Sequence, residues 1–484
     1  MRNSKLFSLS AMRRLLQSTI AATAFSVLCG GCAWRQSKKA STAAATEVGA
    51  VYEQAQRGST TLEPWDRSWW ELFYDPDLDA LIEQGLENNF DLQAFVYRIE
   101  QATALARQSG ARLFPSIDLG ASDRYEWDDR IAAGENKDRE ETTAIGGGLR
   151  WELDLFGRLS AARRARVLQQ EASVQDWLDA RLLLSGAIAE TYFETKEQKR
   201  QLEVILEQIE INESLLKLTT LRFGQGQSSI VDVLQQQEQL DETKARVPQT
   251  EARIAQLEYT LDVLLGKSPG EGDLVRGSSF AKLPPMPTVG IPADLLKRRP
   301  DLRAAEKRLL ALDERLGEAV AEQLPSIIIG GGVDWRGDPR LGDAIRSAFA
   351  SLSVPLFAAG ERRSEVTLRR AELEEGLARY TERFIYAVLE VESILVLERK
   401  LLERLELEEK QLYNAQRLLT EARNRFSQGL TDYLPVFTSL NIVQNLERQI
   451  VSARRDVLSA RVSLHRALGG PIAPPESVAA LSSQ

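Results

Sequence analysis

Residues 222–226 read Arg222-Phe223-Gly224-Gln225-Gly226, and residues 425–429 read Arg425-Phe426-Ser427-Gln428-Gly429, 203 positions later. Glycine tolerates positive φ, so Gly226 and Gly429 suit tight reversals between two helices. A long helical pattern precedes each stretch, and a second helical pattern follows shortly after it. The sequence therefore predicts two helical hairpins with matching turns.

Further pairs of landmarks extend this repeat in both directions, in the same order in each copy. Asn89-Phe90-Asp91-Leu92 corresponds to Arg299-Pro300-Asp301-Leu302, and Phe114-Pro115-Ser116-Ile117 to Leu324-Pro325-Ser326-Ile327, both 210 positions apart. Leu155-Phe156 corresponds to Leu356-Phe357, 201 positions apart, and Leu265-Gly266 to Leu468-Gly469, 203 positions apart. The chain is therefore an internal duplication.

Each copy is predicted to contain a helix, two strands, a very long helix and a second shorter helix. In copy one these are Leu78–Leu113, the hairpin 116–154, Leu159–Phe223 and Ile230–Leu265. At 1.5 Å per residue the long helix would span roughly 97 Å, and the two shorter helices placed end to end roughly 108 Å. Each copy can thus form a long antiparallel pair. Near-heptad spacing predicts a packed seam along Leu405, Leu412, Ala415, Leu419, Ala422 and Phe426.

The strands alternate between apolar and polar residues. In Ser116–Trp127 and Ala144–Asp154, one face is apolar with aromatic ends and the other is polar and charged. Copy two offers Ser326–Trp335 and Phe349–Pro355 with weaker alternation. Lengths of 11 to 12 residues suit tilted membrane strands, and polar loops, Asp128–Thr143 and Arg336–Arg346, would tip the hairpins. The alternative is a soluble hairpin with one buried face.

Four strands cannot close a barrel in lipid, because open edges would leave backbone groups unpaired in hydrocarbon. The strands must therefore be pooled between chains. Two chains would give eight strands, a barrel filled by its own side chains, and three would give twelve, wide enough for a lumen. A duct requires three or more chains.

The first 31 residues have the pattern of a secretory signal peptide. Basic residues precede the short apolar run Leu15–Leu28, which is shorter than the roughly 20 residues that span a bilayer. The run Leu28-Cys29-Gly30-Gly31-Cys32 resembles a bacterial lipobox in which the usual leucine is displaced by one position. We expect lipid attachment at Cys32; the alternative is a Cys29–Cys32 disulfide. Ala33, rather than aspartate, resembles lipoproteins sorted to the outer membrane.

Composition gives little support to an enzyme or a nucleic-acid-binding protein. The net charge is -9, whereas nucleic-acid binding calls for a basic face. His465 is the one histidine, and no cluster of metal ligands or phosphate loop is recognisable. The triplets Gly146-Gly147-Gly148 and Gly330-Gly331-Gly332 lack a following Lys-Ser/Thr, so they are not nucleotide loops. No cofactor is predicted.

Several motifs together make the chain resemble the TolC-like outer membrane efflux factors, in their NodT-type lipoprotein branch. The motifs are Trp69-Trp70-Glu71-Leu72-Phe73-Tyr74-Asp75-Pro76-Asp77-Leu78, Leu295-Leu296-Lys297-Arg298-Arg299-Pro300-Asp301-Leu302, Leu352-Ser353-Val354-Pro355-Leu356-Phe357 and the two Arg-Phe-x-x-Gly turns. The resemblance implies a mainly α-helical homotrimer with a twelve-stranded β-barrel in the outer membrane and a periplasmic α-helical tunnel. It also implies a periplasmic adaptor and an inner-membrane pump, of RND type, as partners.

The resemblance divides the chain as follows: signal peptide 1–31, lipid anchor and N-terminal equatorial segment 32–77, repeat one 78–269, equatorial linker 270–290, repeat two 291–471 with hairpin 326–355, and C-terminal tail 472–484. Residues 33–77, 270–290 and 472–484 would form a belt around the tunnel.

The resemblance also assigns roles to the turns as periplasmic tips. Adaptor docking would involve Arg222, Gly226, Ser229, Arg425 and Gly429. The family often carries aspartates at the copy-two constriction, but Pro435 and Thr438 stand at those positions here. We therefore expect the gate at Leu434, with Asp432 near its rim, and Asp232 as the next candidate.

Two other functions remain open at this point. A duct for type I protein secretion shares the fold, so the sequence separates it poorly from small-molecule efflux. A lipid-anchored coiled-coil tether would share the lipobox and helices but would not need alternating strands.

Overall fold

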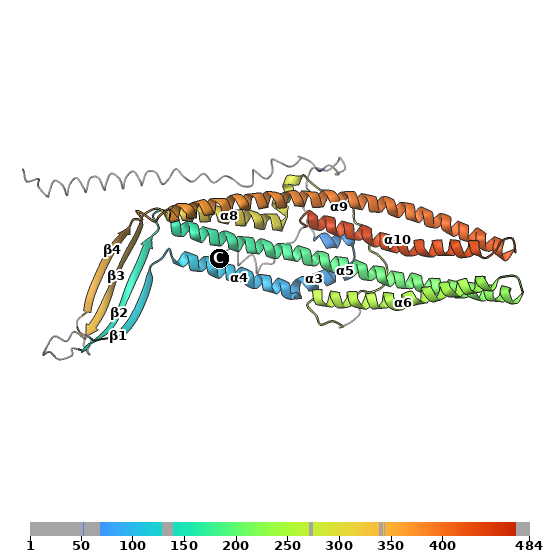
Figure 1. The fold of residues 1–484 in the computed structure, drawn as a ribbon, viewed down its shortest axis with the longest axis horizontal. Coiled ribbons are helices and arrows are strands. Elements are labelled where there is room, and N and C mark those ends of the chain that lie inside the picture. Colours follow the sequence, from blue (N-terminus) through green and yellow to red (C-terminus); the bar gives the residue numbers. More distant parts are fainter. Residues whose placement is uncertain are drawn as a thin grey trace, which may run out of the picture. The chain divides into compact units, whose positions relative to one another are not determined.

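The computed structural model describes residue 52 and residues 68–127, 139–270, 274–337, 342 and 344–470. The chain forms two compact units, each assembled from three segments: the first from 1–43, 101–170 and 306–379, and the second from 44–100, 171–305 and 380–484. Two helices of 67 residues, α5 (Arg158–Gly224) and α9 (Glu361–Ser427), begin in the first unit and end in the second (Figure 1).

The first unit contains one antiparallel sheet in the order β1-β2-β3-β4 (Figure 1). Its strands are β1 (Ser116–Trp127), β2 (Arg139–Leu153), β3 (Ser326–Gly337) and β4 (Ala344–Ser353). Both hairpins are as predicted, but β2 and β4 each begin five residues earlier than expected. Pairing with the neighbouring strand carries them further than side-chain alternation indicates.

The register gives the sheet one mainly apolar and one mainly polar face, although Asp123 and Arg346 lie on the mainly apolar one. On the polar face Ser116 lies opposite Arg150, and Gly146 lies between Gly120 and Asp334. The alternation is weaker in copy two because Ile328 of β3 and both Ile345 and Phe349 of β4 lie on the polar face, and Arg346 of β4 lies on the apolar face. The apolar face carries Ile117, Leu119, Ala121, Tyr125, Ile145, Leu149, Trp151, Leu153, Ile327, Ile329, Val333, Trp335 and Leu352.

The predicted single helix Leu78–Leu113 is wrong, because the chain breaks at Asn89. The helices are α3 (Pro76–Asn88) and α4 (Phe90–Ala111). Asn89 has an extended backbone, and its side-chain oxygen accepts hydrogen bonds from the amides of Asp91 (2.9 Å) and Leu92 (3.2 Å). An asparagine that caps a helix in this way satisfies amides that have no partner within the helix. Copy two breaks at the matching Arg299, between α7 (Leu295–Arg298) and α8 (Pro300–Ala321).

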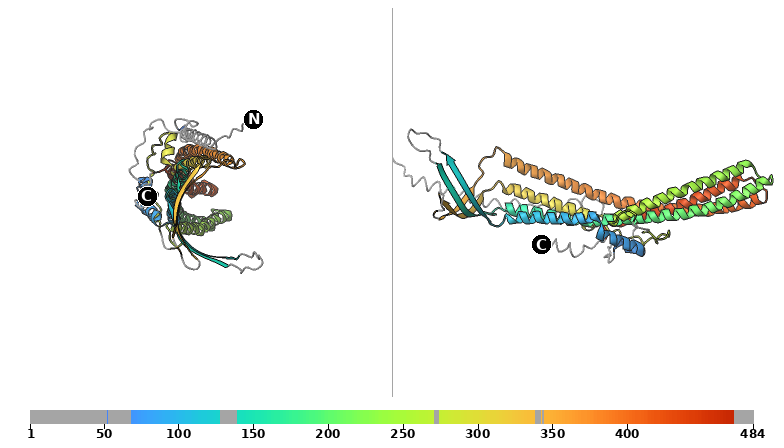
Figure 2. Two further views of the ribbon diagram at one scale, coloured as in Figure 1. Left: turned by 90° about the vertical axis from the view of Figure 1, so that its left-hand side faces the viewer. Right: turned by 90° about the horizontal axis from the view of Figure 1, so that it is seen from below.

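The second unit contains the ends of α5 and α9 with α6 (Ile230–Leu264) and α10 (Leu434–Ala467) (Figure 2). A core around the short helix η1 (Trp69–Phe73) includes Tyr192 and Phe193. The predicted seam is confirmed where Ala415, Leu419, Ala422 and Phe426 are buried in a second core with Tyr433, Val436 and Leu440.

Buried and half-buried cations of the second unit's helices donate hydrogen bonds to the described part of the linker, residues 274–290. Lys196 and Lys199 donate to the carbonyls of Arg276 (2.5 Å) and Val275 (2.6 Å). Arg461 donates to the carbonyl of Pro284 and pairs with Glu398; Arg461 is 2% exposed and Glu398 is fully buried. The structure does not describe the rest of the expected belt apart from residues 52 and 68–77.

Candidate functional site

The polar face of the sheet forms an open hollow with a glycine floor. Gly120, Gly146, Gly148 and Gly332 lie on this face, and the Asp334 side chain lies over Gly146. Its charged lining residues are Asp118, Arg150, Asp334 and Arg336. Such a face suits contact with water, whereas the opposite face suits hydrocarbon.

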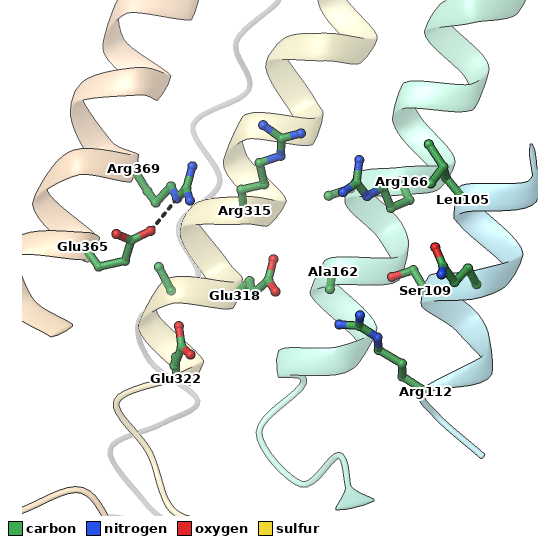
Figure 3. A pocket seen from close by; sticks show the side chains of 13 residues that line it. Leu105, Ser109, Arg112, Ala162, Arg166, Arg315, Glu318, Glu322, Glu365 and Arg369 are labelled. Atoms are coloured by element: carbon green, nitrogen blue, oxygen red, sulfur yellow. Dashed lines mark hydrogen bonds and ion pairs between the residues drawn. The ribbon is translucent and has the colours of Figure 1, made fainter. Parts of the chain in front are cut away.

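A polar cavity of about 320 Å³ lies in the first unit among α4, α5, α8 and α9 (Figure 3). Arg369 pairs with Glu365 at 2.8 Å on α9. The other charged side chains of the wall are Arg112 on α4, Arg166 on α5, and Arg315, Glu318 and Glu322 on α8. The opposite charges nearly balance. In the part of the chain that the structure describes, no group of three or more His, Cys, Asp and Glu side chains could hold a metal ion.

The copy-one turn joins α5 to α6 as its sequence predicts. Gly226 has φ 70°, the amide of Gln227 donates to the carbonyl of Arg222 (2.8 Å), and the Gly226 amide donates to that of Phe223 (2.9 Å). This paired pattern ends the helix with a glycine in the left-handed region. Ser229 then caps α6, since its hydroxyl accepts from the Val231 amide at 3.1 Å.

The copy-two turn joins α9 to α10 with the same helix ending. Gly429 has φ 73°, and the Leu430 amide donates to the carbonyl of Arg425 at 2.9 Å. The start of α10 differs, because the buried Tyr433 takes the capping position without a side-chain cap hydrogen bond. The ring of Tyr433 instead packs edge-on against Phe426, with centroids 5.4 Å apart.

The two turn arginines have different surroundings, which their equivalent sequence positions do not indicate. The Arg222 guanidinium donates to the carbonyl of Phe426 (2.5 Å) and lies 4.2 Å from the centroid of its ring. Arg222 therefore links the two turns within one chain. Arg425 is exposed and pairs with Glu421 on its own helix at 3.0 Å. Of the two, Arg425 is the more available to a partner protein.

The predicted gate residues lie at the surface of the copy-two turn. Leu434 is the first residue of α10 and is 57% exposed, and Asp432 is exposed two positions earlier. Pro435 and Thr438 are also exposed in the first two turns of that helix. The carboxylate of Asp232, in contrast, is already hydrogen-bonded at the start of α6. It accepts from the Ser229 amide (2.9 Å) and the Ser228 hydroxyl (2.7 Å).

A buried amide cluster near the turns was missed by sequence reasoning. Asn212 of α5 accepts from Gln444 of α10 at 3.1 Å, and Gln239 of α6 donates to Gln444 at 3.2 Å. Gln236 donates to the Asn212 carbonyl (3.0 Å) and accepts from the Tyr433 hydroxyl. Glutamines in a coiled-coil sequence read as surface residues. The one signal for burial was the position of Gln236 and Gln239, which share the buried face of α6 with Leu240.

His465 belongs to a core and not to a reactive site. It is fully buried, stacks on Trp69 with centroids 5.9 Å apart, and lies beside Phe73. Burial, with a smaller effect from the positive charge of Arg461, lowers its pKa to about 3. His465 therefore packs as an uncharged ring in this core.

The lipid-attachment residue Cys32 lies outside the described residues. Within the residues that the structure describes, no helix contains an apolar stretch long enough to cross a membrane.

The family described as outer membrane efflux protein matches residues 81–267 and 291–470. The chain is 28% identical to the pyoverdine export outer membrane protein OpmQ of Pseudomonas putida KT2440, covering 84% of this chain and 88% of the relative. It is 25% identical to the probable outer membrane lipoprotein SilC of Salmonella typhimurium, covering 84% and 88%. The solved structure of the outer-membrane channel OprN superposes with a TM-score of 0.79 at 27% identity, covering 88% of this chain and 99% of that chain.

Proposed function

Because the chain belongs to the outer membrane efflux protein family, we propose that three copies of it form a passive exit duct in the outer membrane of a Gram-negative bacterium. The single observation that carries this proposal is the sheet of the first unit. It has a mainly apolar and a mainly polar face, as expected for a strand wall between lipid and water. Its likeness to the channel OprN supports the same function.

Three chains are proposed from the strand count and the unpaired sheet edges. Within the described residues, β1 and β4 each pair with one strand only. Open edges in hydrocarbon would cost several kcal/mol for each unpaired group, so the edges must meet those of other chains. Twelve strands leave a lumen, whereas eight would be filled by side chains.

The duct would serve a periplasmic adaptor and an inner-membrane pump of RND type, which supplies the energy. OpmQ exports pyoverdine by its name, which favours a small-molecule cargo here. The proposed adaptor-docking surface is the exposed copy-two turn, with Arg425 and Gly429. Gly226 and Ser229 shape the copy-one turn, which would contribute to the same surface. The wall residues supply charge and shape and perform no catalysis.

Reconstitution tests the duct directly. Purified protein added to a planar bilayer should give discrete conductance steps. These steps should need no pump and no chemical energy source, since the pathway is passive. Heat-unfolded protein serves as the control. A preparation that binds the bilayer without any steps contradicts the proposal and favours a lipid-anchored tether.

The anchor is proposed at Cys32, supported by the lipobox and by the likeness to SilC. Intact mass spectrometry of the mature protein should give a chain that begins at Cys32 and carries diacylglycerol and an acyl chain. Cys32→Ser should lose these lipids yet still require detergent for extraction, because the barrel remains. A mature chain with another first residue, or without lipid, contradicts the assignment.

A further inference from the structure

The polar cavity of about 320 Å³ among α4, α5, α8 and α9 is lined by charges that the fold leaves without counterions. In the described ranges of the chain, the guanidiniums of Arg315 on α8 and Arg166 on α5 form no ion pair, and neither does the carboxylate of Glu318 on α8. Arg369, in contrast, already pairs with Glu365 on its own helix. The three unpaired groups are therefore open to a ligand.

The unpaired side chains converge on the space between α8 and α5. Arg315 extends into it from α8 and Arg166 from α5, and Glu318 reaches it from the α8 side (Figure 3). Arg166 donates to the side-chain oxygen of Gln169 at 3.1 Å, which leaves further N–H donors of its guanidinium for a ligand. Two guanidiniums can hold a carboxylate between them, and Glu318 can hold an ammonium group beside it.

Equivalent positions of the two repeats line this cavity. Each lining residue of α4 has a counterpart 210 positions later on α8, as Arg112 has in Glu322. Arg166 of α5 likewise has Arg369 of α9, 203 positions later. The helices stand side by side in the order α9, α8, α5 and α4 (Figure 3). Equivalent faces of such a row can meet at one space only on the concave side of the row, which is the inner side of the proposed ring.

A neighbouring cavity connects this side of the helices to the polar face of the sheet. Glu322 borders both cavities, and Glu152 and Arg158 border the second one. Glu152 pairs with Arg158 at 2.7 Å and lies on the mainly polar face of β2, two positions from Arg150. The charges of Glu318 and Glu322 also act on Arg158. The cavity therefore lies on the side of the wall that faces water in the proposed duct.

Copy two alone supplies the charges on the α8 side of the cavity. The α4 counterparts of Arg315 and Glu318 are Leu105 and Gln108, which are uncharged, so the duplication does not repeat this site. The volume has room for roughly ten water-sized groups, enough for a small solute. We propose that the cavity is a cargo-binding subsite for small zwitterions that carry a carboxylate and an ammonium group; this inference rests on the proposed function.

Binding to the detergent-purified trimer tests the site, with triglycine as the zwitterion. N-acetyltriglycine keeps only the carboxylate of this probe, and triglycinamide keeps only the ammonium group. Titrations followed by saturation-transfer-difference NMR should give an affinity for triglycine at least about fivefold above that for either analogue, because triglycine makes one additional ion pair. The advantage should disappear at about 1 M salt, where screening shortens to about 3 Å.

Two variants assign the two ends of the probe. Arg166→Gln with Arg315→Gln should weaken the binding of triglycine and N-acetyltriglycine by about fivefold and should not weaken that of triglycinamide. Glu318→Gln should weaken the binding of triglycine and triglycinamide and should not weaken that of N-acetyltriglycine. The matched control is Arg163→Gln, which removes an exposed arginine of α5 outside the cavity lining and should change none of the three affinities.

Two results would overturn the zwitterion site. One is a trimer that binds triglycine no more tightly than the analogues, or binds none of the probes; the other is full triglycine affinity in the variant that lacks both arginines. In either case, conductance steps of the same preparation in a planar bilayer would show that the duct stands. If no trimer or no conductance step is found, the proposed function itself fails.

Discussion

Replacing Arg461 with methionine is expected to destabilise the second unit by about 3–5 kcal/mol. Arg461 of α10 pairs with Glu398 of α9, and both side chains are almost completely buried. Without the arginine, Glu398 would carry an unpaired charge in a dry interior, and the carbonyl of Pro284 would lose its donor. The midpoint of thermal unfolding, followed by far-ultraviolet circular dichroism in detergent, should fall clearly.

Two variants separate the buried charge from a general effect of substitution. Arg461→Met with Glu398→Leu should recover most of the lost stability, because an apolar pair can replace a buried ion pair at little cost. Arg425→Ala removes the partner of the exposed Glu421 and should change stability by less than about 1 kcal/mol. Equal losses for Arg461→Met and the double variant would show that the unpaired charge of Glu398 is not the cause.

Leu434→Ala is expected to raise the single-channel conductance severalfold. We propose that Leu434 side chains of three chains meet at the periplasmic mouth, since each is exposed at the first position of α10 beside the copy-two turn. An apolar ring can close a pore by excluding water, so its removal opens the narrowest point. Leu430→Ala, which changes an exposed leucine on the turn itself, is the matched control.

Asp432→Ala tests the charge near the same mouth and should weaken cation selectivity. The loss should be smaller in concentrated salt, because screening shortens to about 3 Å at 1 M. Reversal potentials across a salt gradient measure the effect. Unchanged conductance in Leu434→Ala would place the constriction elsewhere. Asp232 is then a weaker substitute than the sequence indicates, since its carboxylate already caps α6.

The sequence predicted the architecture well where one physical rule dominated locally. The glycine turns at Gly226 and Gly429, the 67-residue helices and the two hairpins follow from chain reversal and side-chain period. The prediction failed at Asn89, because the helical spacing of apolar residues continues through this position. The side chain of Asn89 caps α4, and its NH2 group also donates to the carbonyl of Leu264, far along the chain. The early start of β4 was missed because its first residues break the alternation: Ile345 lies on the polar face, opposite Asp334, and Arg346 lies on the apolar face.

The candidate site was harder to predict, because its residues act through contacts between the two copies. Arg222 and Arg425 are equivalent in sequence, yet only Arg222 reaches the other turn, at the carbonyl of Phe426. The bond between Tyr433 and Gln236 likewise joins residues of different copies. No pattern within one copy carries such information. Exposure at Leu434 and Asp432 agrees with the predicted positions and leaves their roles as proposals.

Three chains are proposed to pool four strands each into one barrel. Native mass spectrometry of the detergent-purified, lipid-bearing protein measures this directly. We predict a single assembly of three mature chains, lighter than three full chains of 54.1 kDa by the three removed leaders and heavier by the attached lipids. A stable monomer that retains a barrel signature, or an assembly of two chains, would contradict it.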